Sequence, residues 1–121
     1  MKKSDKKLEK NIVAALTDVC EKDLKRYDGF LWVTHLVSYQ QFPESFSIIC
    51  VFDSDDNVAK VMKVDSGRAI KEAIEQSLSS HNIVIPGVER RMVFDSEQAC
   101  DREHGGSWDR RFAEFRNARH A

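Results

Sequence analysis

The chain has 121 residues, of which 41% are hydrophobic and 32% charged, and its formal net charge is −1. This length suits one globular domain rather than two, and the composition excludes an intrinsically disordered chain. No apolar run approaches the roughly 20 residues that a membrane helix needs, and the lysine-rich start has no apolar signal-peptide core. We therefore expect a single α+β domain, residues 1–121, with no membrane partner and with frayed ends at 1–6 and 116–121.

Charge is spread unevenly along the chain. Residues 1–26 carry eight lysines and arginines against five acids, residues 27–82 carry four against eight, and residues 83–121 carry seven against seven. A basic first segment on an acidic body is typical of a solvated helix face. The same pattern is compatible with an acidic protein or a nucleic acid as partner.

The three cysteines indicate a reducing compartment. Cys20, Cys50 and Cys100 are odd in number, far apart and placed in three different predicted elements. Such spacing favours free thiols in the cytoplasm over a disulfide framework. The chain contains no complete signature of a nucleotide, metal or cofactor site, so we expect no cofactor.

An amphipathic helix opens the chain. Apolar residues from Leu8 to Tyr27 recur every three or four positions, which predicts a helix with one buried face. Ser4 is its predicted cap, and Asp28–Gly29 is its predicted end because glycine suits the left-handed stop position.

Two segments rich in β-branched and aromatic residues follow, at 30–39 and 46–52. The polar loop between them predicts an antiparallel hairpin over 30–52. Its second segment is apolar on both faces, which is typical of a central strand. A third strand is predicted at 83–94, with a turn or bulge where proline and glycine adjoin.

Residues 54–64 fit two structures. The polar residues 54–56 are a typical helix start and the valines after them share a helical face, but 58–64 also suits a strand. We favour a short helix. Residues 66–80 then show clear helical periodicity.

Two further helices are predicted after the third strand. Asp95 is the predicted N-cap of the first, and Gln98 completes a capping box with it. Gly105 is the predicted end of that helix, and Ser107 is the predicted cap of the last one.

These elements give the order α-β-β-α-α-β-α-α. They predict an α+β fold with one small, mostly antiparallel sheet, formed by the hairpin 30–52 and the strand 83–94 and covered by helices. With a helix at 54–64, the first six elements resemble the second type of KH domain, which grips nucleic acid with a GXXG loop. The corresponding loop here, residues 63–68, contains a single glycine.

With a strand at 58–64, the order would instead match metal-dependent restriction-type nucleases. Asp53 would then be the first metal-binding acid. The second site needs an acid two residues before a lysine, and neither Lys60 nor Lys63 has one. The nuclease interpretation therefore lacks half of its carboxylates.

The last helix carries the candidate partner-binding residues. Arginine and aromatic side chains dominate the hot spots of protein interfaces, and this helix combines both types. The candidates are Trp108, Arg110, Arg111, Phe112, Phe115 and Arg116. The alternative is that the three aromatic side chains, spaced for one helical face, pack on the sheet.

Cys100 and His104 are weak candidates for a metal site. They stand four residues apart on one helical face, which is ligand spacing, but a zinc site needs two more ligands and the sequence shows no CxxC. A buried thiol and a histidine at a helix end are the simpler interpretation. His35, in the middle of a predicted strand, is a candidate for catalysis or for a structural hydrogen bond.

The stretch Phe94–Trp108, together with Trp32-x-Thr34-His35, resembles a group of small gammaproteobacterial proteins, some of them catalogued as Fis-family transcriptional regulators. The resemblance implies a bacterial, cytoplasmic setting. The Fis family is all-helical and ends in a helix-turn-helix whose last helix enters the major groove of DNA. No residue of that motif has a matching position in this chain.

The sequence therefore favours a non-enzymatic protein-interaction or regulatory module over an enzyme. Its expected partner is a protein of unidentified nature, and a homodimer is compatible with the pattern. The alternative is a nucleic-acid-binding protein that uses its basic ends, which predicts binding that weakens steeply with salt.

Overall fold

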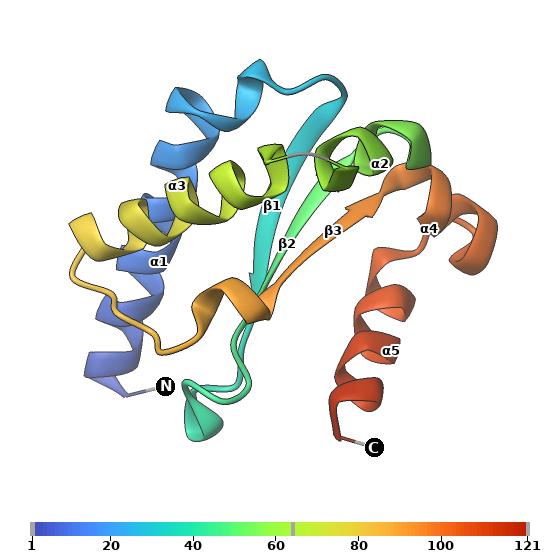
Figure 1. Cartoon of the computed structure of the whole chain (residues 1–121). Coiled ribbons are helices and arrows are strands. Elements are labelled where there is room, and N and C mark those ends of the chain that lie inside the picture. Colours follow the sequence, from blue (N-terminus) through green and yellow to red (C-terminus); the bar gives the residue numbers. More distant parts are fainter. Residues whose placement is uncertain (1, 64, 121) are drawn as a thin grey trace.

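The computed structural model describes residues 2–63 and 65–120, without the side chains of 117–120. Three strands, β1 (Phe30–Leu36), β2 (Ser47–Phe52) and β3 (Met92–Ser96), form one sheet in the order β1-β2-β3. Helices lie on both of its faces, which confirms the predicted α+β class (Figure 1). Part of the expected fraying concerns residues 1 and 121, which lie outside the described residues.

The sheet is mixed rather than mostly antiparallel. β1 and β2 form the predicted antiparallel hairpin, in which Val33 lies opposite Cys50. β3 instead runs parallel to β2, with Ile48 opposite Met92. The two helices between β2 and β3 make the parallel pairing possible, because parallel neighbours need a long crossover connection.

Three helices cover one face of the sheet (Figure 1). They are α1 (Lys3–Lys22), α2 (Asp55–Lys63) and α3 (Ser66–Ser80). α2 confirms the helix that we favoured at 54–64. The helices bury the main core against β2, and its largest members are Phe46, Phe52, Ile12, Leu24, Ile48, Ile70, Ile74 and Leu78.

The first helix differs from its prediction at both ends. α1 begins at Lys3 without a side-chain cap, so Ser4 is its second residue. It ends at Lys22, and a 3-10 turn, η1 (Leu24–Arg26), continues the chain toward the turn at Gly29. The apolar periodicity continues past the helix because Leu24 in η1 is buried in the same core.

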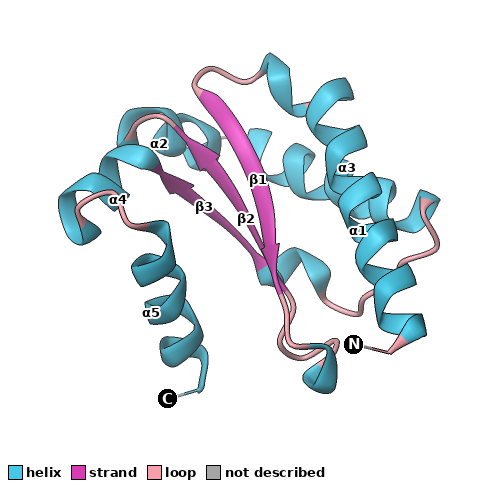
Figure 2. Ribbon diagram, turned by 180° about the vertical axis from the view of Figure 1, so that it is seen from behind, coloured by secondary structure: helices cyan, strands magenta, loops and turns pink. Residues whose placement is uncertain are grey.

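The opposite face of the sheet is covered by α5 (Trp108–His120), which follows the short helix α4 (Glu97–His104) (Figure 2). A second, smaller core lies here. It consists of Leu36, Ile49 and Val51 from the sheet, with Trp32, Trp108, Phe112 and Phe115 packed against them. None of the helices within residues 2–63 and 65–120 is long and apolar enough to cross a bilayer.

The predicted third strand was wrong in its bounds. The strand expected at 83–94 is Met92–Ser96, and the residues before it form a loop that ends in a 3-10 turn, η3 (Val88–Arg91). The apolar side chains that suggested a strand, among them Ile83 and Ile85, are buried in the main core as anchors of that loop. The prediction failed because these residues are apolar and buried, as strand residues are, but lie in a loop.

The predicted capping box of α4 was also wrong. Ser96 is the N-cap, and its Oγ accepts a hydrogen bond of 2.9 Å from the backbone N–H of Ala99. The Ser96 hydroxyl donates at 2.7 Å to Oδ1 of Asp55 at the start of α2. Asp95 is the last residue but one of β3 and turns its side chain to α5, while the Gln98 oxygen accepts from the backbone N–H of Asp55.

Because Ser96 joins two helix starts, we expect Ser96→Ala to lower the free energy of unfolding by about 1–2 kcal/mol. The substitution leaves the buried N–H of Ala99 without an acceptor. Urea denaturation of the purified protein measures the loss. Ser80→Ala is the control, since the Ser80 hydroxyl is exposed and donates to the carbonyl of Gln76 in its own helix. Equal losses for both variants would contradict the capping role.

Candidate functional site

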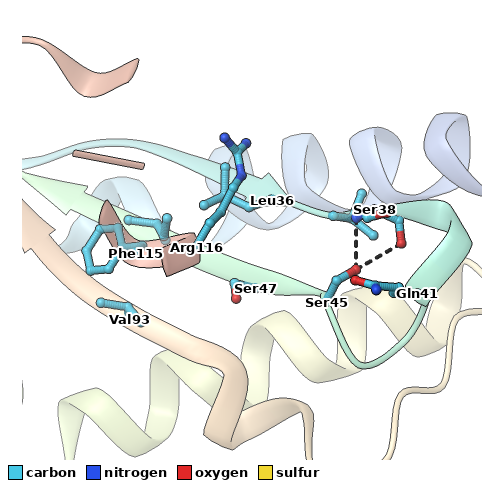
Figure 3. A pocket seen from close by; sticks show the side chains of 10 residues that line it. Leu36, Ser38, Gln41, Ser45, Ser47, Val93, Phe115 and Arg116 are labelled. Carbon is cyan, nitrogen blue, oxygen red and sulfur yellow. Dashed lines mark hydrogen bonds between the residues drawn. The ribbon is translucent and has the colours of Figure 1, made fainter. Parts of the chain in front are cut away.

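α5 leaves part of its sheet face uncovered. Between the end of this helix, the end of β1 and the start of β2 lies a hollow of about 280 Å³ (Figure 3). We call it the α5 pocket. The residues that line it include Leu36, Ile49, Val93, Phe115 and Arg116, together with Gln41 and three serines.

The floor of the α5 pocket is apolar. Leu36 and Ile49 point toward α5 from neighbouring strands, and Val93 does so from β3 with 37% of its surface exposed. Strand alternation places these side chains on one face, opposite the main core. Phe115 closes the pocket from the helix side (Figure 3). The pocket therefore favours an apolar occupant.

The rim of the pocket is polar and is held by a short hydrogen-bonded loop. The Ser45 hydroxyl accepts from the backbone N–H of Ser38 at 2.8 Å and donates to its carbonyl at 2.9 Å. Arg116 lies at the rim above Leu36 (Figure 3). Its side chain is exposed and forms no ion pair with any described residue. The positive charge of Arg116, which forms no ion pair with a described residue, therefore borders an apolar hollow.

α5 is held on the sheet by a buried ion pair. Arg111 is 9% exposed and Asp95 is 6% exposed. Two parallel hydrogen bonds join them, from Nε to Oδ2 at 2.6 Å and from Nη2 to Oδ1 at 2.8 Å. Hydrogen bonding to Asp95 raises the pKa of Arg111 above its ordinary value. This bidentate geometry fixes both the position and the rotation of α5.

The remaining guanidinium nitrogen of Arg111 reaches α4. Its Nη1 lies 3.2 Å from Nδ1 of His104 and 3.3 Å from Oε1 of Glu103. Because arginine can only donate, Nδ1 of His104 is the acceptor in this contact. Nε2 of His104 bonds Glu114 of α5. Both ring nitrogens of His104 therefore serve the contact between α4 and α5.

The metal interpretation finds no support in this arrangement. Cys100 is fully buried, and burial raises the pKa of its thiol. Both ring nitrogens of His104 have partners, Nδ1 at Arg111 and Nε2 at Glu114. Within the described residues, no group of three or more His, Cys, Asp and Glu side chains is placed to hold a metal ion.

The aromatic residues of α5 are used mainly for packing. The ring of Trp108 meets that of Trp32 edge to face, with centroids 4.9 Å apart, and Phe112 lies beside it at 5.4 Å. Nε1 of Trp32 donates to Glu97 at 3.1 Å, which ties β1 to α4. The packing alternative therefore holds for Trp108 and Phe112.

The six candidate residues of the last helix thus divide into three groups. Trp108, Phe112 and Arg111 attach the helix to its own sheet. Arg110 is exposed and lies outside the α5 pocket. Phe115 and Arg116 line the pocket and remain the candidates for contact with a partner.

His35 lies on the other face of the sheet and serves a polar network. Its Nε2 lies 2.8 Å from Oε1 of Glu9 in α1, and the Tyr39 hydroxyl donates to the same oxygen at 2.6 Å. The His35 ring packs beside Phe46 of the main core. The network links α1 to the hairpin, which supports the structural interpretation of His35.

A second hollow, of about 600 Å³ and open to solvent, runs along α3 on the main-core face. We call it the α3 groove. It is bordered by Phe94 of β3, Met62, Arg68 and Lys71, with Nζ of Lys71 5.9 Å from the centre of the Phe94 ring. Three acids also border it, namely Glu72, Glu75 and Glu89. Its charges are therefore mixed.

Sequence reasoning found the helix side of the α5 pocket and missed the sheet side. Leu36 and Ile49 were placed in the predicted hairpin 30–52 and Val93 in the predicted strand 83–94, without an assignment of helices to the two faces of the sheet. The alternation along β1 and β2 was visible, but it does not tell which helix covers which face.

Comparison with known proteins finds no matching family model, no similar curated protein and no similar solved structure.

We expect Arg111→Met to lower the free energy of unfolding by about 3–5 kcal/mol, because it leaves the buried Asp95 carboxylate without a counter-charge. Chemical denaturation measures the loss, and limited proteolysis shows whether α5 is released first. Arg110→Met is the matched control, an exposed arginine of the same helix, with an expected change within about 0.5 kcal/mol. The double variant Arg111→Met, Asp95→Leu is expected to regain part of the loss; equal stability of Arg111→Met and Arg110→Met would show that the pair does not anchor α5.

The Glu9 network predicts a pH dependence of stability. Burial opposes ionisation of Glu9, but the hydrogen bonds from Tyr39 and His35 outweigh it, so the pKa of Glu9 lies below its ordinary value of 4.5. A carboxylate with a lowered folded-state pKa stabilises the fold above its unfolded pKa, and this contribution disappears as the pH falls through the folded value.

We therefore expect Glu9→Gln to cost about 1 kcal/mol near neutral pH and progressively less below pH 4.5. Urea midpoints of both proteins at several pH values between about 7 and 3 measure the difference. Tyr39→Phe, which removes one donor, is expected to lose a smaller amount. A difference between wild type and Glu9→Gln that stays constant over this range would contradict the lowered pKa.

Proposed function

We propose that the chain is a protein-interaction module that binds an apolar segment of a protein partner in the α5 pocket. One observation carries the proposal: an apolar hollow is bordered by Arg116, a cation that pairs with no described acid. An occupant that combines an apolar side chain with a neighbouring carboxylate would satisfy both features. The partner is therefore expected to carry an acidic residue next to its apolar anchor.

The size of the pocket supports a side-chain anchor. Its volume of about 280 Å³ lies just below the range of about 300–1,000 Å³ that is typical of small-molecule sites. Interfaces often depend on one or two apolar residues that fill such a well-packed pocket on the partner. The rigid floor of Leu36 and Ile49 and the loop held by Ser45 suit this use, because a preformed pocket avoids the cost of ordering on binding.

The chemistry of the pocket supports binding rather than catalysis. Arg116 is the one ionisable side chain among the described residues that line it. An activated nucleophile needs a histidine or a carboxylate beside it as a base, and the described residues that line the pocket include no histidine, aspartate or glutamate. An interaction module needs neither group.

Nucleic acid binding through basic side chains stays the alternative proposal. Arg68 and Lys71 beside the Phe94 ring combine positive charge with an aromatic surface, as single-strand binders do. The three acids that border the α3 groove oppose a phosphate backbone there. Fluorescence anisotropy with a labelled oligonucleotide at several salt concentrations tests this alternative, since phosphate contacts weaken steeply with salt.

A displayed library of random linear peptides, selected against the full chain, supplies the probe for the main proposal. We expect selected peptides to share an apolar residue next to an acidic one. Arg116→Glu is expected to weaken their binding about tenfold, because it replaces an ion pair by a like-charge contact. Isothermal titration calorimetry measures the dissociation constants.

Two matched controls accompany this test. Arg110→Glu makes the same charge change on the same helix outside the pocket and is expected to leave affinity unchanged. Val93→Asp places a carboxylate in the pocket, whereas Val84→Asp places one on a loop residue that is 82% exposed elsewhere. A library without specific binders, or equal effects of Arg116→Glu and Arg110→Glu, would refute the proposed function.

A further inference from the structure

We propose that the partner segment binds as an added β-strand along β3, so that its backbone pairs with the open edge of the sheet. This inference rests on the proposed function and specifies how the occupant of the α5 pocket is held. In such a mode, main-chain hydrogen bonds supply affinity and alternate side chains supply specificity.

The two edges of the sheet differ in how they are protected. β1 and β3 lie at opposite edges (Figures 1 and 2). α1 and the turn η1 both contact β1, so that edge lies beside other elements of the chain. Within residues 2–63 and 65–120, no hydrogen bond outside the β2 ladder reaches the backbone of 92–94. Every second residue of an edge strand directs its N–H and C=O outward, so β3 offers unpaired backbone groups.

The open edge of β3 has a hollow on each side. Val93 lines the α5 pocket, and the next residue, Phe94, lines the α3 groove on the opposite face. Because successive side chains of a strand point to opposite faces, a strand laid beside β3 would direct alternate side chains into the two hollows. A helix seated in the α5 pocket alone would leave the edge and the α3 groove unused.

The chemistry of the two hollows defines the segment. Toward the α5 pocket it needs an apolar residue over Val93, with a carboxylate near enough to pair with Arg116. Toward the α3 groove it needs an apolar residue against Phe94 and Met62, since the charges of that rim are mixed. The fitting partner is an extended, proline-free peptide with alternating apolar positions and an acidic residue on the pocket side.

The open stretch is short, and this favours a peptide over a second copy of the chain. Asp95 and Ser96 are buried at 6% and 1% exposure, where α2 and α4 contact β3. Three residues of edge are too few for two folded domains to bury the roughly 800 Å² per partner that a standard interface needs. A slender peptide gains the remaining area from the two hollows.

Backbone methylation of a selected peptide tests the strand directly. Each residue in turn is N-methylated, which removes one donor and keeps every side chain. We expect methylation to weaken binding about tenfold at alternate positions and to leave the positions between them unchanged. A periodicity of two is the signature of a strand, because every second backbone N–H of the peptide faces the edge of β3.

Amide hydrogen exchange of the ¹⁵N-labelled full chain supplies a second readout. Bound peptide is expected to slow exchange at every second residue of 92–94 at least about tenfold, while the amides of β1 stay unchanged. Sedimentation velocity of the free chain accompanies the measurement, to detect self-association through the same edge.

The outcomes separate the two proposals. Peptides that bind and respond to Arg116→Glu, but show no alternation under methylation and no slowed exchange in β3, would overturn strand addition and leave the interaction module intact. A library without binders would overturn both. A dimer of the free chain whose formation slows exchange in β3 would make a second copy the occupant and would overturn the peptide partner.

Discussion

The buried pair of Arg111 and Asp95 is the interaction on which the candidate site depends. Asp95 stands near the end of a strand that the crossover through α2 and α3 brings beside β2, and Arg111 stands one turn into α5. Their two parallel hydrogen bonds set how far α5 rises from the sheet. That spacing leaves a hollow at the far end of the helix, whereas Trp108 and Phe112 fill the space between the helix and the sheet at the near end.

The sequence predicted the elements well and their assembly less well. Helical periodicity located α1, α3 and α5, and β-branched residues located the hairpin, because these signals are local. The parallel pairing of β3 was missed, because two helices between β2 and β3 are compatible with either strand direction. Asp95 was expected to cap α4, since an acid before a helix is a common cap. Its carboxylate instead binds Arg111 of α5, and Ser96 is the N-cap.

The candidate site was predicted only in part, for a physical reason. Phe115 and Arg116 were among the expected partner residues because their types are common in interfaces. The hollow itself arises where three parts of the chain meet, namely the hairpin residues 36–49, Val93 of β3 and the end of α5. Nothing local to Val93 marks it as a pocket residue, because its exposure depends on where α5 ends above it.

The smaller core is completed late in synthesis, because its sheet residues and α5 lie far apart in the chain. The strands that carry Trp32, Leu36 and Ile49 are made long before α5, whereas α1 precedes the strands that it covers. During translation α1 is already made when β1 and β2 emerge, and α2 and α3 follow directly after β2, but the other face stays uncovered until Trp108 and Phe112 are made. A nascent chain therefore exposes an apolar sheet surface for the time that about sixty residues take to emerge, on the order of several seconds. Until α5 arrives, that face is where chaperones would be expected to act.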